Sequence, residues 1–383
     1  MSTTCLACGC PSIVPCLNLG SQPLANDFKN TETEPEELYP LAVVRCVECN
    51  HLQLDYFIDP DLMFKNYLYV SGTSATYRDY LSWFAHKVAK NGDKVLDIGC
   101  NDGTQLDMFK AMGCETWGVD PAENLWPVSS AKHKVTLGYF DETYNPGVKF
   151  DVMNAQNVFA HNRGPMGFLV NAKRFMHENT RLYIQTSQAD MVLNGEFDTI
   201  YHEHINFFNV LSFKKLTERA GLVLLDVIKT KIHGTSYMFV VGIEGEPGEN
   251  VKNEIECEEK AGLQNAVTYD TWARNCHAFA AKVRTELEDA FVIAYGAAAK
   301  GNTMLNFLKF KPNVIIDDNP LKQGKFSPGM RVPVVGSEYL NNIPSNLGVV
   351  FLPLAWNLFD EIKTQILKIR NNPMDSFYNL RLT

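Results

Sequence analysis

The stretch that decides the fold is Lys94–Thr104, which reads KVLDIGCNDGT. Its first five residues are a short apolar run typical of a buried strand, and apolar residues at helical spacing follow over 106–112. Between them, the pattern Gly99-x-Asn101-x-Gly103 predicts a strand-to-helix turn, because glycines let the backbone approach a ligand closely. The dinucleotide fingerprint G-x-G-x-x-G is not met, since Asn101 occupies its second glycine position. This difference favours a cofactor without a pyrophosphate.

A second apolar run, Thr116–Asp120, ends in an acid. A carboxylate at this position can accept hydrogen bonds from both ribose hydroxyls of a nucleoside. We expect Gly138–Asp141 to lie near the adenine, with Asp141 contacting its amino group. The order of strand, glycine turn, helix, strand and acid predicts an S-adenosylmethionine (SAM) site. The alternative is a structural turn in which Asp120 caps a helix.

More strands are expected after this site, over 150–159 and 181–185, with an antiparallel pair over 222–227 and 238–241. These segments complete the doubly wound sheet of a class I, Rossmann-like methyltransferase domain. His161 follows the first of them closely. Ligands of open α/β sheets lie beyond the carboxyl ends of the strands, so His161 is expected at the ligand edge.

The amino-terminal segment carries two paired thiols, Cys5-x-x-Cys8 and Cys46-x-x-Cys49. Two such pairs can complete a tetrahedral thiolate shell around Zn²⁺. Because a closed four-thiolate shell has no open position for water, this zinc is expected to be structural. Cys10 and Cys16 lie nearby but lack the paired spacing, and four reduced cysteines without a metal are the alternative.

The carboxy-terminal segment repeats the strand, glycine turn and helix pattern over 291–303. We therefore expect a second Rossmann-like domain. Lys300 near the start of a helix would suit a diphosphate, although the P-loop pattern is not met because Lys300 precedes Gly301. A repeated scaffold with a solvated lysine is the alternative. The expected domains are a zinc module over 1–70, a methyltransferase domain over 71–246 and a second Rossmann-like domain over 247–383.

The densest group of ionisable side chains is the stretch Phe197–His204, FDTIYHEH. It follows the strand at 181–185 by roughly a dozen residues, which suits a catalytic loop beyond the strand's carboxyl end. A solvated loop is the plain alternative, since local density of such groups is only suggestive. Likewise, Tyr67 and Tyr69 belong to a loop that either covers a ligand or packs in an ordinary way.

Composition narrows the class of protein. At 383 residues, two or three domains are expected. The formal net charge of -9 opposes a nucleic-acid binder, and no run approaches the roughly 18 apolar residues of a membrane span. The start lacks the basic and apolar regions of a signal peptide. We therefore expect a cytoplasmic protein without nucleic-acid or membrane partners, as a monomer with an oligomer left open.

Taken in order, these motifs resemble the three-domain, zinc-containing, SAM-dependent C-methyltransferases that act on nucleotide-linked deoxysugars. The resemblance covers essentially the whole chain. It rests on the motifs above together with the segments 157–161, 201–204, 296–303 and 317–324. One departure is Thr235, where the family pattern has the second glycine of a pair.

The resemblance implies a keto-sugar substrate on thymidine diphosphate or a similar carrier, and it implies roles for individual residues. The catalytic set would comprise His204 as general base with Tyr201, Glu203, His161 and Tyr69. The set of cofactor-binding residues would comprise Asp97, Gly99, Asn101, Gly103, Asp120, Asp141 and Asn157. The substrate would contact Lys300 and Asn302.

The predicted chemistry is proton removal beside a ketone by neutral His204, with Glu203 or Tyr201 orienting it or stabilising the oxyanion. A histidine suits this role because its reference pKa lies near neutrality. His202 has no assigned task. The alternatives are an O- or N-methyltransferase on a similar sugar, a non-catalytic nucleotide-sugar-binding protein and, more remotely, a zinc-ribbon nucleic-acid adaptor.

Overall fold

The computed structural model describes residues 3–65, 67, 70–73, 75–186, 190–232 and 234–382. The chain forms two compact units, and it passes between them several times. Unit 1 comprises Met1–Val14, Val44–Asp190 and Glu203–Asn265, and unit 2 comprises Pro15–Val43, Met191–His202 and Ala266–Thr383.

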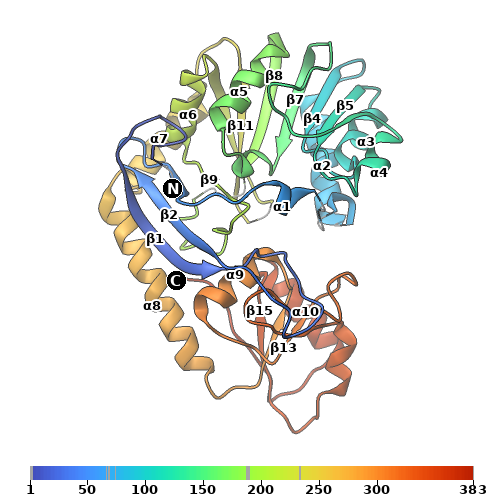
Figure 1. Cartoon of the computed structure of the whole chain (residues 1–383), viewed down its shortest axis with the longest axis vertical. Coiled ribbons are helices and arrows are strands. Elements are labelled where there is room, and N and C mark those ends of the chain that lie inside the picture. Colours follow the sequence, from blue (N-terminus) through green and yellow to red (C-terminus); the bar gives the residue numbers. More distant parts are fainter. Residues whose placement is uncertain are drawn as a thin grey trace. The chain divides into compact units, whose positions relative to one another are not determined.

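Unit 1 is built on a seven-stranded sheet of order β10-β11-β8-β7-β4-β5-β6 (Figure 1). The five strands from β8 to β6 are parallel, whereas β11 is antiparallel to β8 and β10 is antiparallel to β11. This is the predicted doubly wound methyltransferase sheet with its closing antiparallel pair. Its strands are β4 (Lys94–Ile98), β5 (Glu115–Asp120), β6 (Lys134–Leu137), β7 (Phe150–Gln156), β8 (Met176–Thr186), β10 (Val223–Thr230) and β11 (Ser236–Gly242).

Helices cover both faces of this sheet because its central strands are apolar on both sides. Phe84 of α2 and Phe109 of α3 pack against Val95 and Val152 on one face. Phe168 of α5 and Phe213 of α6 belong to the core of the other face. The helical elements of unit 1 are α1 (Asp61–Phe64), η1 (Ser71–Thr73), α2 (Ala75–Val88), α3 (Thr104–Ala111), α4 (Trp126–Ser130), η2 (Phe159–His161), α5 (Pro165–Arg174), α6 (Val210–Arg219) and α7 (Glu249–Lys260).

A small second sheet has the strand order β1-β2-β3-β9. Its strands are β1 (Ile13–Gln22), β2 (Tyr39–Cys46), β3 (Leu52–Leu54) and β9 (Asn206–Phe207). Within unit 1, β3 pairs antiparallel with β9, with Leu52 opposite Phe207 and Gln53 opposite Asn206. The residues that follow Cys49 are therefore hydrogen-bonded to the residues that follow His204.

Unit 2 contains the predicted second Rossmann-like sheet, which is parallel throughout and has the order β14-β13-β12-β15-β16. Ile293, Val314 and Phe351 lie in its core. The elements are α8 (Ala266–Leu287), β12 (Val292–Tyr295), α9 (Ala299–Leu308), β13 (Val314–Ile316), β14 (Val334–Val335), η3 (Ser337–Asn342), β15 (Val350–Pro353), η4 (Trp356–Leu358), α10 (Phe359–Ile369) and β16 (Ser376–Phe377).

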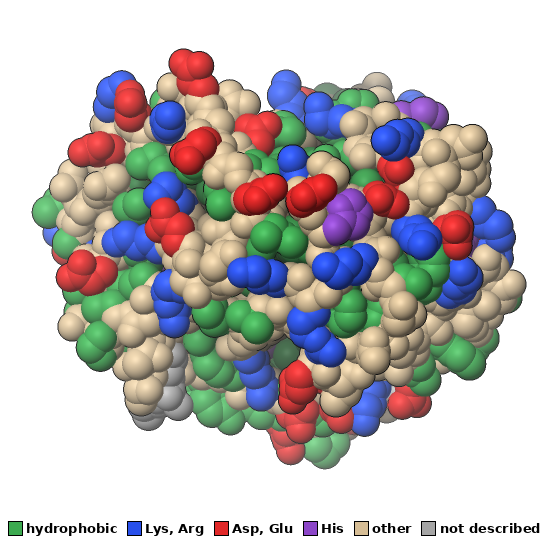
Figure 2. All heavy atoms as spheres, turned by 90° about the horizontal axis from the view of Figure 1, so that it is seen from above, with side chains coloured by type: hydrophobic (Ala, Val, Ile, Leu, Met, Phe, Trp, Pro, Cys, Tyr) green, Lys and Arg blue, Asp and Glu red, His purple; other side chains and the backbone are tan. Residues whose placement is uncertain are grey.

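The domain limits 1–70, 71–246 and 247–383 stay a prediction. Compactness divides the chain differently, because both cysteine pairs belong to the same unit as the seven-stranded sheet. In the part of the chain that the structure describes, no helix combines the length and apolarity that a membrane crossing needs. On the face shown in Figure 2, basic and acidic side chains are interspersed.

Candidate functional site

A cavity of about 630 Å³ opens at the carboxyl ends of the parallel strands of unit 1. The glycine turn after β4, the end of β5 and the turn after β7 contribute to its wall. Five residues of the predicted cofactor set line it, and they are Gly99, Asn101, Asp120, Asp141 and Asn157. Asp97 and Gly103 are not among the described lining residues. Asp97 lies buried in β4, and Gly103 packs towards Ser129 and His133.

The turn after β4 depends on backbone conformations that favour glycine and asparagine. Gly99 and Asn101 have φ angles of 75° and 50°, in the left-handed region that most side chains avoid. A Cβ atom at Gly99 would overlap Val158 Cγ2. The absence of a side chain at Gly99 therefore allows the turn after β7 to approach closely, which brings two walls of the cavity together.

Asp120 holds this turn in place. Its Oδ2 accepts a hydrogen bond from Asn101 N and its Oδ1 accepts one from Ala122 N, each at 2.8 Å. Because Ala122 precedes α4 by several residues, the second bond is not a helix cap. Burial raises the pKa of Asp120. The pKa of Asp97 is raised well above its ordinary value by burial and by the nearby carboxyls of Asp120 and Asp102.

Three buried polar atoms along the cavity wall have no hydrogen-bond partner within the described structure. They are Gln156 Nε2, Asn157 Oδ1 and His161 Nε2, and all three residues line the cavity. Tyr80 donates to Gln156 Oε1 at 3.1 Å, so the amide nitrogen is left as the free end. Since buried polar groups are normally paired, these atoms indicate that a polar ligand completes the wall. The set fits the amino acid and nucleoside groups of SAM.

Asp141 is partly engaged within its own turn. Its Oδ1 accepts hydrogen bonds from Thr143 N at 2.9 Å and from Thr143 Oγ1 at 2.6 Å. Asp141 lines the cavity beside Phe140. Its contact with adenine stays a prediction, and only its second oxygen has no bond to this turn.

Two histidines that are distant in sequence lie side by side, and one of them, His161, lines the cavity. The rings of His161 and His204 have centroids 5.0 Å apart, and Phe64 stacks on His161 at 5.5 Å. His204 is only 1% exposed. Burial lowers the pKa of His161 to about 4, so this imidazole is neutral near pH 7. We call His161 and His204 the histidine pair.

Glu203 is linked to the cavity wall by Tyr67. The Tyr67 hydroxyl donates to Glu203 Oε2 at 3.2 Å, and Tyr67 lines the cavity together with Phe64. The predicted site includes Tyr69, which lies outside the described residues. It does not include Tyr67 or Phe64. The signal that could have indicated Tyr67 is the aromatic loop that contains Tyr67 and Tyr69.

The stretch Tyr201–His204 is divided between the two units. Glu203 and His204 belong to unit 1, whereas Tyr201 and His202 belong to unit 2. Within unit 2, the ring of His202 lies edge-on to Tyr39 with centroids 6.0 Å apart, and burial lowers the pKa of His202 to about 4. His202 is thus a packed, neutral histidine, in agreement with the absence of any predicted task.

Unit 2 repeats the strand-end arrangement of unit 1. Asp317 accepts hydrogen bonds from Ala297 N at 2.7 Å and Asn319 N at 2.8 Å, as Asp120 does from its own turn. Lys300 is half-buried in the first turn of α9. Asn302 is 1% exposed and donates to Ala25 O at 2.8 Å. This bond gives Asn302 a structural task inside unit 2, and the substrate contacts of Lys300 and Asn302 stay predictions.

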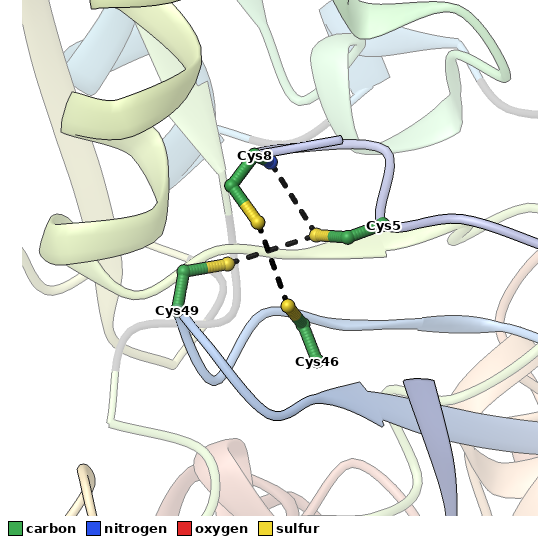
Figure 3. A group of neighbouring side chains, drawn as sticks. All are labelled: Cys5, Cys8, Cys46 and Cys49. Atoms are coloured by element: carbon green, nitrogen blue, oxygen red, sulfur yellow. Dashed lines mark hydrogen bonds between the residues drawn. The ribbon is translucent and has the colours of Figure 1, made fainter. Parts of the chain in front are cut away.

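The four paired cysteines converge as the spacing predicts (Figure 3). Their sulfur atoms all lie within 4.8 Å of one another, with Cys5 to Cys49 at 3.6 Å and Cys8 to Cys46 at 3.5 Å. Zn–S bonds of about 2.3 Å in a tetrahedron require sulfur separations of about 3.8 Å, so the geometry fits zinc. The hydrogen bond from Cys49 lowers the pKa of Cys5. Among the described residues, this is the cluster that could hold a metal.

Families of known proteins match three consecutive segments of the chain. A family described as a zinc binding domain matches residues 5–64. A family described as a methyltransferase domain matches residues 69–227, and one described as a C-methyltransferase C-terminal domain matches residues 231–376. Fold and site thus define a SAM-dependent methyltransferase with a zinc-binding domain. The three matches, in this order along the chain, fit a three-domain, zinc-binding C-methyltransferase.

Individual relatives include the C-methyltransferase NovU from Streptomyces niveus, which is 28% identical over 94% of this chain and 90% of its own length. A tRNA U34 carboxymethyltransferase from Idiomarina loihiensis is 29% identical over 29% of this chain and 36% of its own length. The crystal structure of a SAM-dependent methyltransferase from Clostridium acetobutylicum covers 44% of this chain and 91% of its own, with 12% identity and a TM-score of 0.35.

Proposed function

We propose that this enzyme methylates a carbon beside the ketone of a nucleotide-diphospho-sugar, with His204 as the general base. The observation that carries the proposal is the histidine pair, in which His161 lines the cavity and the buried His204 lies against it, with Glu203 next to His204 along the chain. A C–H group beside a ketone is a weak acid, so C-methylation needs a base, whereas a hydroxyl or amine can attack the methyl group directly. The similarity to NovU over nearly the whole chain supports transfer to carbon.

In this mechanism the chain's own residues manage the proton. A neutral His204 removes a proton from the sugar carbon, and its buried position beside His161, on which Phe64 stacks, keeps bulk water away. His161 is neutral because of its burial, so it places no positive charge against the imidazolium that forms at His204. The Tyr67 hydroxyl orients the Glu203 carboxylate, which favours that imidazolium.

When bound, SAM would supply an electrophilic sulfonium methyl group for the deprotonated carbon, with S-adenosylhomocysteine as the leaving group. Gly99, Asn101, Asp120, Asp141 and Asn157 would hold it at the cavity. Gln156 joins this group, because it lines the cavity and its unpaired Nε2 is available to donate to a ligand oxygen. The zinc at the four cysteines would be structural and would not contact the reacting atoms.

For the acceptor, we propose a deoxy-keto-sugar on thymidine diphosphate. The half-buried Lys300 in the first turn of α9 supports a diphosphate contact, because a helix amino terminus and a cation both favour phosphate. The resemblance to sugar C-methyltransferases supports the sugar. A mass-spectrometric screen of nucleotide-linked keto-sugars with SAM would identify the carrier and the methylated carbon.

The test of the mechanism is the variant His204→Asn. Turnover should fall by about 10²–10⁴-fold, the usual contribution of a general base, while SAM affinity measured by calorimetry stays nearly unchanged. Exchange of solvent deuterium into the sugar should fall in parallel. His177→Asn is the matched control, because His177 bonds Asp151 at the opposite end of the sheet. Deuterium exchange at the wild-type rate in His204→Asn would refute the assignment of His204 as the base. Methyl transfer to oxygen or nitrogen without exchange would refute C-methylation.

A further inference from the structure

The chain on either side of the histidine pair is tied together by its backbone. Ile205 N, directly after His204, donates to Ala160 O at 2.8 Å, directly before His161. On its other side, Ile205 O accepts a hydrogen bond from Leu54 N of β3 at 2.9 Å. The residues next to both histidines are therefore fixed to β3, the strand that follows the second cysteine pair.

The side chain of Asn206 bridges the same elements. Its Nδ2 donates to Asn162 O at 2.6 Å, and its Oδ1 lies 3.1 Å from His51 Nε2. Asn206 and His51 are both fully buried. Because an amide oxygen only accepts, the contact requires the proton on His51 Nε2. One buried amide thus joins the residue after His161 to the second residue after Cys49.

The loops of both cysteine pairs are hydrogen-bonded to residues on either side of this bridge. Gln53, opposite Asn206 in the β3–β9 ladder, accepts from Leu6 N at 2.8 Å and donates to Thr4 O at 3.1 Å. The Asn209 side chain donates to Cys49 O at 3.2 Å and to Asn50 O at 3.1 Å. The segment that carries His204 is thereby held by the loops of both pairs. We call Cys46–Leu54 the zinc hairpin.

We propose that Asn206 is a positioning residue, through which the zinc hairpin holds His161 and His204 in their reactive arrangement. The inference rests on the proposed function for what the histidine pair does. It goes further in giving the zinc site an indirect task in catalysis: the metal would order β3, and β3 is hydrogen-bonded to the residues next to His204. A reacting group displaced by about 1 Å loses up to about 100-fold in rate, so the loss of one buried bridge is measurable.

The test replaces each end of the bridge. Asn206→Leu keeps a similar size but removes both hydrogen bonds, and His51→Leu removes one of them from the side of the zinc hairpin. His51→Gln retains an N–H donor for Asn206 Oδ1 and serves as the rescue variant. The matched control is Thr180→Val, because Thr180 is equally buried and also bridges two backbone groups, His177 N and Phe150 O, at the far end of the sheet.

Turnover and solvent deuterium exchange into the sugar should fall by about 10- to 100-fold in Asn206→Leu and His51→Leu. His51→Gln and Thr180→Val should stay close to wild type. SAM affinity and zinc content should be unchanged in all variants. Nuclear magnetic resonance of ring-labelled histidines supplies a readout apart from activity: the signals of His161 and His204 should shift in Asn206→Leu and, in the wild type, on removal of zinc by a chelator.

Three results would overturn the inference. One is turnover in Asn206→Leu that matches Thr180→Val. Another is a parallel loss of SAM affinity or zinc, which would mean a general structural role. The third is a set of histidine signals that zinc removal leaves in place. The variant His204→Asn distinguishes failure of the general base from failure of the positioning role. Persistent deuterium exchange in His204→Asn refutes the general base. An inactive His204→Asn together with a fully active Asn206→Leu refutes only the positioning role.

Discussion

The carboxyl group of Glu258 makes the stability of unit 1 depend on pH in a direction that can be worked out. Glu258 lies on α7, is 3% exposed and stands at the amino terminus of α6. Its Oε1 accepts from Val210 N at 2.8 Å and from the Tyr237 hydroxyl at 3.1 Å. Burial raises the pKa of Glu258 from 4.5 to about 7, because these hydrogen bonds offset the cost of desolvation only in part.

The sign follows from the proton balance. Between pH 4.5 and about pH 7 the folded protein holds a proton on Glu258 that the unfolded chain has released. The stabilisation is fully present below pH 4.5 and is lost as the pH rises through about 7. With about 1.36 kcal/mol for each tenfold difference in proton affinity, the whole effect is about 3 kcal/mol. About 2 kcal/mol of it falls between about pH 5.5 and about pH 8.5.

The perturbation is Glu258→Gln, which keeps an acceptor for Val210 N but cannot ionise. Urea unfolding followed by hydrogen–deuterium exchange of the α6 peptide would report unit 1 by itself, since a chain of two units need not unfold in one step. Between about pH 5.5 and about pH 8.5, the free energy of unfolding of the wild type should fall by about 2 kcal/mol more than that of Glu258→Gln. Glu259→Gln, an exposed change on the same helix, is the control. Equal pH dependence in the wild type and Glu258→Gln would refute the reasoning.

Two further predictions concern the cavity. Gly99→Ala should lower the free energy of unfolding by at least about 1–2 kcal/mol and weaken SAM binding, because an L-residue is strained at this φ and its Cβ meets Val158. Thermal unfolding with and without SAM measures both effects. An unchanged unfolding midpoint would contradict them. His161 should remain neutral at about pH 5.5, because burial lowers its pKa to about 4; nitrogen chemical shifts of the labelled ring measure this directly, and a midpoint near 6.5 would show that the ring is solvated.

The sequence alone determined the parts of this protein that follow from local rules. The turn at Gly99 is predictable because glycine and asparagine favour its φ angles, and the strands on either side follow from their apolar runs. The four zinc ligands are predictable because an x-x spacing places two thiols on one side of a turn. The parallel sheets follow from the alternation of strands and helices along the chain.

The position of Asp120 is predictable in the same way, but the use of its carboxylate is not. The sequence placed an acid at the end of β5, and only the structure shows both oxygens bonded to the backbone of the turn. For a related reason, the sequence does not single out Gln156, and it leaves Tyr67 between covering a ligand and ordinary packing. Glutamine at a strand end and tyrosine in a loop are common, and only the cavity wall distinguishes these two.

Tertiary structure decided which residues meet. His161 and His204 are neighbours because β3 pairs with β9 and Ile205 bonds Ala160, and no local pattern encodes such a contact between distant segments. It also divided Tyr201–His204, leaving His202 packed on Tyr39 in unit 2 while His204 packs against His161 in unit 1. Backbone propensity acts over a few residues, whereas these choices depend on long-range hydrogen bonds and burial, which exist only once the chain has folded.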